Sequence, residues 1–269
     1  MALNRKCISL SISRLCLSLM TAFMLALPAF AQEVRKSDIV RVLQSLHELP
    51  GIKEGYEQSG FDAERTALML NHTRLMMANR NVANYVADKL IAARLGQPST
   101  TQLGGVVQPL TDRGIAHLPL KEQIYFLQVE TTVLRAMTTN NCGRAMKETI
   151  NPETFSRDNQ RVVSRLNTPA LAEYLRILRK ATITGASRKS PPRISYSTRE
   201  RVSDRYFAAA LARAEKENLM SQLQRSATSM NVLSNKDACR LGLMFVDTAI
   251  DFDGAEKRTL MQLFLLGFE

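Results

Sequence analysis

The stretch "DAERTALMLNHTRLMMANRNVANYVADKLIAARL" (residues 62–95) decides the fold class of this chain. It contains neither glycine nor proline, and it is rich in Ala, Leu, Met and Arg, which favour helices. It therefore predicts a long helical run, with an alternative break near Asn79–Asn81. The same composition continues elsewhere, because the 269 residues include only 12 glycines and 9 prolines and no tryptophan. We expect an irregular all-α bundle of seven to nine helices.

Helix start and stop signals divide the rest of the chain. Ser37 is a predicted N-cap, and Pro50-Gly51 is predicted to end that first helix. Pro119 fits the first turn of a helix that runs to about residue 138. Thr168-Pro169 has the pattern of an N-cap followed by proline at the first helical position.

Three capping boxes predict the last helices. In such a box a side-chain oxygen caps the helix and an acid three residues later reaches back. The boxes are Ser197…Glu200, Ser234…Asp237 and Asp253…Glu256, and they predict helices near 198–228, 235–250 and 254–266. The final stretch "TLMQLFLLGFE" (residues 259–269) is dense in large apolar side chains, which predicts that this last helix is buried.

Residues 96–118 contain Gly104-Gly105 and two prolines with little periodicity, so they are predicted to form a loop or linker. Only 106–110 and 193–197 resemble strands, and both are too short to build a sheet. The predicted organisation is one all-α domain over residues 32–269. The alternative subdivides it into N-terminal helices 32–95, the linker 96–118 and C-terminal helices 119–269.

The N-terminal 31 residues have the pattern of a cleaved Sec-type signal peptide. The apolar run 15–27 is short for a bilayer-spanning helix, and three positive charges and no acid precede it. Ala29-Phe30-Ala31 matches the small-x-small cleavage pattern, so the mature chain would begin at Gln32. The rival interpretation is an uncleaved anchor over residues 8–30. Since no later run is apolar enough to span a bilayer, we expect a soluble periplasmic or secreted product.

Cleavage would leave two cysteines, Cys142 and Cys239. In an oxidising compartment an even pair predicts a disulfide, and the rival interpretation is two buried free thiols.

Positive charge is concentrated in one third of the chain. Residues 135–205 hold 15 basic and 6 acidic residues. The candidate anion-binding patch is Arg176, Arg179, Lys180, Arg188, Lys189, Arg193, Arg199 and Arg201. An anionic envelope component, such as lipid phosphates, or an acidic protein would suit this patch. No nucleic acid is expected, because stacking aromatics and a groove-binding motif are lacking. The rival interpretation is a solvated helical face.

The residue spacings that usually carry chemistry are not found. His47, His72 and His117 include no i, i+4 pair of the kind that binds zinc, and no Gly-x-Ser-x-Gly elbow occurs. The sequence therefore predicts no catalytic residue, no metal site and no cofactor.

These patterns favour a non-catalytic binding or structural module of the bacterial envelope. A helical hydrolase of envelope polymer or lipid is the first alternative, and it would need one histidine to meet an acid or a serine in a cleft. A chaperone or regulator of another secreted protein is the second. The sequence does not determine the oligomeric state.

Overall fold

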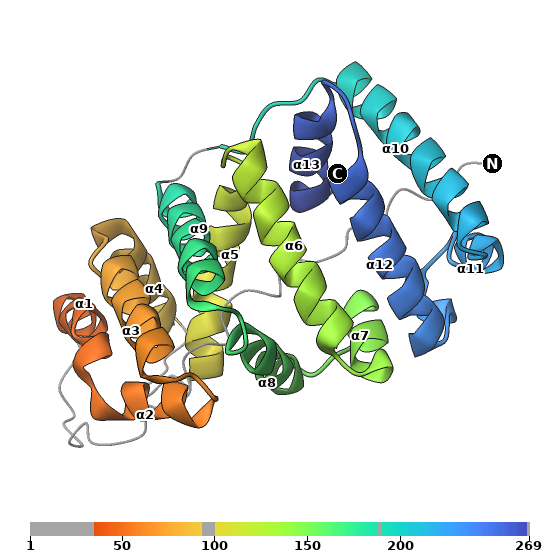
Figure 1. Ribbon diagram of the computed structural model, residues 1–269. Coiled ribbons are helices and arrows are strands. Elements are labelled where there is room, and N and C mark those ends of the chain that lie inside the picture. Colours follow the sequence, from red (N-terminus) through yellow and green to blue (C-terminus); the bar gives the residue numbers. More distant parts are fainter. Residues whose placement is uncertain (1–34, 93–99, 188–189, 268–269) are drawn as a thin grey trace. The chain divides into compact units, whose positions relative to one another are not determined.

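The computed structural model describes residues 35–92, 100–187 and 190–267 (Figure 1). Every regular element in these ranges is helical, which confirms the all-α class. The ranges contain thirteen α-helices, so the predicted seven to nine is wrong. The predicted signal peptide lies outside the described residues. None of the described helices combines the length and the apolarity that a membrane crossing requires.

The described residues form two compact units. Unit 2 comprises 35–92, 100–115 and 159–187, and unit 1 comprises 116–158 and 190–267. The boundary falls within helix α8 (Pro152–Val163). The single-domain organisation of residues 32–269 stays a prediction.

Unit 2 is built from six helices. They are α1 (Lys36–Gln44), α2 (Pro50–Gln58), α3 (Ala63–Met77), α4 (Arg80–Ala92), α5 (Thr100–Ile115) and α9 (Thr168–Ala186). The first four, α1 to α4, lie together in Figure 1. A short 3₁₀ helix, η3 (Leu46–Glu48), joins α1 to α2. The predicted break in the opening stretch is confirmed, because the Asn79 side chain accepts from the Val82 N–H at 3.2 Å and starts α4.

Two predicted helix ends in unit 2 are wrong. Ser37 does not cap α1, because the N-cap position is Arg35, two residues earlier, and the helix begins at Lys36. Pro50 starts α2 instead of ending α1, since proline is tolerated in a first turn. The cap of α9 is also displaced by one residue, because Asn167 rather than Thr168 accepts from the Ala170 N–H, at 2.9 Å.

The predicted loop over 96–118 is wrong for residues 100–115, which form α5, and the strand candidate 106–110 lies inside this helix. Packing against α9 explains the difference, because it outweighs the weak local propensity. Gly114 and Gly185 each face the backbone of the other helix so closely that a Cβ at either position would overlap a carbonyl oxygen. The Thr111 and Thr182 hydroxyls, both buried, bond across the contact at 2.8 Å.

Unit 1 contains six complete helices, among which α10 and α12 run side by side (Figure 1). They are α6 (Leu120–Ala136), α7 (Thr139–Met146), α10 (Tyr196–Lys216), α11 (Met220–Arg225), α12 (Asn235–Asp251) and α13 (Lys257–Leu266). A 3₁₀ helix, η4 (Met230–Val232), precedes α12. The predicted helix over 198–228 is therefore two helices, α10 and α11.

A disulfide between Cys142 and Cys239 links α7 to α12, as the sequence predicts. Both cysteines are buried. Glycines stand beside them, since Gly143 faces the Asn235 backbone and Gly242 faces the Met146 side chain. This helix pair resembles the α5–α9 pair in using glycine at the point of closest approach.

One of the three predicted capping boxes is confirmed. The Ser234 hydroxyl accepts from the Asp237 N–H at 3.1 Å and caps α12. The box at Ser197 is wrong, because Ser195 caps α10. The strand candidate 193–197 is not a strand, since residues 193–195 have no regular structure and residues 196–197 begin α10. The box at Asp253 is also wrong, since α13 begins at Lys257 without a side-chain cap.

The last helix is buried within unit 1, as its apolar composition predicts. Leu260, Leu263 and Phe264 are all buried. The Phe264 ring lies edge-on to Tyr206, with ring centroids 6.1 Å apart. Tyr206 is itself fully buried, and its hydroxyl donates to the Phe245 carbonyl at 2.9 Å. Residues 268–269 lie outside the described ranges.

Candidate functional site

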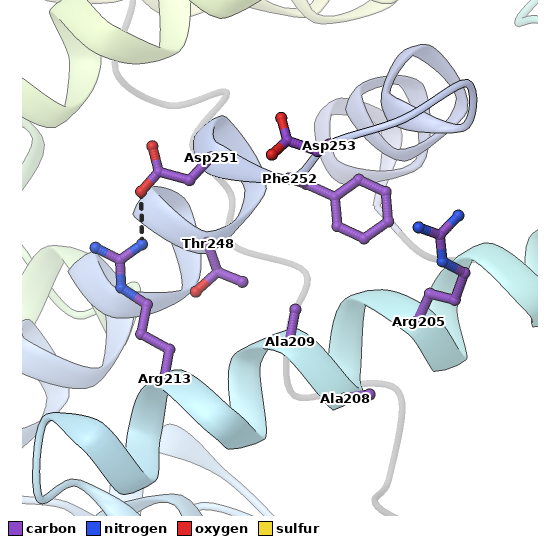
Figure 2. A pocket seen from close by; sticks show the side chains of 8 residues that line it. All are labelled: Arg205, Ala208, Ala209, Arg213, Thr248, Asp251, Phe252 and Asp253. Carbon is purple, nitrogen blue, oxygen red and sulfur yellow. Dashed lines mark hydrogen bonds and ion pairs between the residues drawn. The ribbon is translucent and has the colours of Figure 1, made fainter.

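A hollow of about 490 Å³ opens on unit 1 between α10 and the C-terminal end of α12 (Figure 2). Eight residues line it: Arg205, Ala208, Ala209, Arg213, Thr248, Asp251, Phe252 and Asp253. Arg205 and Arg213 are two turns apart on α10, about 12 Å along its axis, and the alanines between them leave the space open.

Both arginines of the hollow already have counter-charges. Arg213 donates to Asp251 and to Glu217, each at 2.8 Å. Burial works against its charged form, but these hydrogen bonds outweigh burial and raise the pKa of Arg213. Arg205 donates to Glu256, and its guanidinium carbon lies 5.2 Å from the centre of the Phe252 ring. The hollow is therefore balanced in charge, and the pair between Arg213 and Asp251 joins α10 to α12.

None of the three histidines lines the hollow. His72 is buried in α3, where Nδ1 donates to the Leu175 carbonyl at 3.1 Å. His47 Nε2 lies 3.7 Å from a carboxylate oxygen of its neighbour Glu48. Within the described ranges, no group of three or more His, Cys, Asp or Glu residues is arranged to hold a metal ion.

The eight residues of the predicted patch are divided between the two units. Arg193, Arg199 and Arg201 belong to unit 1, and Arg201 is paired with Glu256 at 2.6 Å. Arg188 and Lys189 lie outside the described residues. The remaining three lie close together on α9 in unit 2, and we call them the α9 cation face: Arg176, Arg179 and Lys180.

Within the α9 cation face, the two arginines have different surroundings. Arg176 makes a bidentate pair with Glu173, with N–O distances of 2.7 and 2.8 Å. Arg179 is half-buried, and none of the described carboxylates pairs with it. Burial and then the nearby Arg176 charge lower the pKa of Arg179. Arg179 is thus a partly desolvated cation, and the neighbouring charge that lowers its pKa, Arg176, has the same sign.

The structure also shows a cationic cluster that charge counting missed. Tyr85 in α4 is in contact with Lys89 of the same helix and with Arg113 of α5, each with its charged atom 5.6 Å from the ring centre. The segment 32–134 holds as many acids as bases, so its net charge gives no sign of this cluster. The i, i+4 spacing of Tyr85 and Lys89 on a helix is the one local signal, and Arg113 comes from a segment predicted to be a loop.

Comparison of this chain with models of protein families, with curated proteins and with solved structures finds no match.

Proposed function

We propose that this chain is an exported binding module of the bacterial envelope, and that its α9 cation face contacts phosphate groups of anionic lipids. The observation that carries the proposal is Arg179, a half-buried cation without a described carboxylate partner. Keeping an arginine partly desolvated beside another arginine costs free energy, and an anion would offset that cost. A guanidinium group also matches the oxygens of phosphate in a bidentate geometry.

The disulfide supports the exported location. Disulfides persist in oxidising compartments such as the periplasm and are rare in the reducing cytosol. The bond between Cys142 and Cys239 therefore agrees with the signal peptide predicted over residues 1–31. The mass of the protein isolated from its natural host tests export. We expect a chain that begins at Gln32 and whose two thiols react with an alkylating agent only after reduction, whereas a chain that begins at Met1 with reactive thiols would contradict export.

Vesicle binding tests the lipid contact. We expect the protein to sediment with vesicles that contain phosphatidylglycerol and not with pure phosphatidylcholine vesicles, and to dissociate at high salt because screening weakens surface charge interactions. One basic residue near an anionic membrane contributes about 1 kcal/mol, so Arg179→Gln should weaken binding about fivefold.

Arg41→Gln is the matched control, because it removes the same charge from an 80% exposed side chain on α1. It should leave vesicle binding nearly unchanged. Equal losses in the two variants would mean that only net charge matters, and equal binding to both kinds of vesicle would reject the lipid contact altogether. Arg179→Gln should not lower the melting temperature, since it removes repulsion from Arg176.

A further inference from the structure

The Tyr85 cluster lies on different helices from the α9 cation face and has a chemistry of its own. Lys89 Nζ and the Arg113 guanidinium carbon are each 5.6 Å from the centre of the Tyr85 ring. Such contacts between a cation and an aromatic ring are attractive, because the face of the ring is negative. The ring therefore attracts two positive charges, one from α4 and one from α5.

No described carboxylate neutralises these two charges. The nearest acid to Lys89 in sequence, Asp88, pairs with Lys36 at 2.5 Å. Because both charges lie within 5.6 Å of one ring centre, they are at most about 11 Å apart, which is close to the screening length at physiological salt. Their fields therefore overlap, and the two charges together attract an anion toward the Tyr85 ring.

The guanidinium group of Arg113 also makes a hydrogen bond within its own helix. Its Nε donates to the Pro109 carbonyl at 3.1 Å, within α5. This bond and the Tyr85 ring restrict the guanidinium group, and none of the described acceptors bonds to its two terminal nitrogens. Holding the cations in place beforehand reduces the entropy that a ligand must remove when it binds.

We infer that Tyr85, Lys89 and Arg113 form a binding site for a phosphate group. The three side chains offer donors of three kinds: the guanidinium fork, the ammonium group and the phenol hydroxyl. A carboxylate would be satisfied by the two parallel hydrogen bonds of Arg113 alone, whereas phosphate has further oxygens for the other two donors. The site therefore prefers phosphate, either free or as the headgroup of a lipid.

Phosphate titration of the full chain, labelled with ¹⁵N-arginine, tests the site by nuclear magnetic resonance. At constant ionic strength, phosphate but not chloride should shift the Arg113 Nε–H signal in a saturable way. Lys89→Gln should weaken this binding about tenfold, because it removes one charge-assisted hydrogen bond. Tyr85→Leu should weaken it as well, since the cations would lose the ring that positions them.

Lys53→Gln is the matched control. It removes a lysine that is 62% exposed on α2 and paired with Glu57, and it should leave the phosphate affinity within twofold. A titration without saturation, or equal weakening in Lys53→Gln and Lys89→Gln, would overturn the site. Circular dichroism of each variant shows whether the fold is retained.

Vesicles distinguish the two sources of phosphate. If Lys89→Gln weakens binding to phosphatidylglycerol vesicles, the ligand is a lipid headgroup, and if it weakens only the binding of inorganic phosphate, the ligand is a free phosphate or phosphate ester. Both results support the site, and no effect in either experiment overturns it. Arg179→Gln should leave the Arg113 signal and its response to phosphate unchanged. The Arg113 titration therefore tests the phosphate site independently of the proposed lipid contact of the α9 cation face.

Discussion

His72 should make the stability of this protein depend on pH between about 4 and 6.5. Its side chain is 3% exposed, Nδ1 donates to the Leu175 carbonyl, and Nε2 is buried without a partner. Because a carbonyl can only accept, Nδ1 carries the hydrogen of the neutral ring. Burial, followed by the positive charge of Arg179, lowers the pKa of His72 from 6.5 to about 4.

The sign of the effect follows from proton binding in the two states. Between pH 6.5 and 4 the unfolded chain binds a proton at His72 and the folded chain does not, so the free energy of unfolding falls as the pH falls through this window. Above pH 6.5 the contribution is constant. A shift from 6.5 to about 4 corresponds to about 3 kcal/mol of lost stability at pH 4 and about 2 kcal/mol at pH 5.

Two variants that cannot titrate isolate this contribution. His72→Asn places an amide near the position of Nδ1 and His72→Gln places one near Nε2, so the two differ in hydrogen bonding but not in charge. Urea unfolding, followed by circular dichroism from pH 7 to pH 4 with the disulfide intact, should show a flatter pH dependence in both variants by about 3 kcal/mol. Curves that run parallel to that of the natural protein would refute the buried neutral histidine.

Four further changes test the helix contacts, the disulfide and one helix cap. Gly114→Ala should lower the free energy of unfolding by about 3 kcal/mol or more, because its Cβ would overlap the backbone of α9. Gly105→Ala on the same helix meets no atom within 4 Å and should raise stability by about 0.5–1 kcal/mol, so equal urea midpoints for the two variants would contradict the α5–α9 contact. Reducing the disulfide between Cys142 and Cys239 should cost about 4–5 kcal/mol for a separation of 97 residues, measured as the fall in melting temperature with reductant. Ser234→Ala should cost about 1 kcal/mol through loss of the α12 cap, and an unchanged urea midpoint would show that the cap contributes nothing.

Local sequence signals determined the fold class but not the helix ends. Composition alone was enough for the all-α class, because helix-favouring residues occur along the whole chain. The caps at Asn167 and Ser195 lie one or two residues before the predicted ones. Each stands within two residues of another side chain that can also cap, so the local sequence does not choose between them.

Helix α5 shows where local reasoning fails for a physical reason. Gly104-Gly105 and Pro109 weaken a helix locally, so residues 96–118 were predicted to be a loop. Gly114 is unfavourable by the same measure, yet it lets α5 approach α9 closely enough for backbone contact. The contribution of that contact depends on Gly185, which lies 71 residues further along the chain. Local helix propensity takes no account of a packing partner so far away in the sequence.

The candidate sites show the same limit. Positive charge in residues 135–205 could be counted from the sequence, but its neutralisation could not. Arg201 is paired with Glu256 across 55 residues, while Arg179 has no described carboxylate partner. Because Arg201 is paired with Glu256, it is not a free contact for another anion. Charge density therefore indicates a region, whereas burial and partners decide which arginine within it is available.

The disulfide and the glycines of unit 1 belong to one packing arrangement. A disulfide requires Cα atoms about 4.4–6.8 Å apart, and those of Cys142 and Cys239 are 5.2 Å apart. Gly143 permits that approach, because a side chain there would overlap the Asn235 backbone and push α7 away from α12. The approach of the helices therefore comes from their packing, and the bond joins thiols that packing has already brought together. Its stabilising effect then arises mainly in the unfolded chain, where it restricts a loop of about 97 residues.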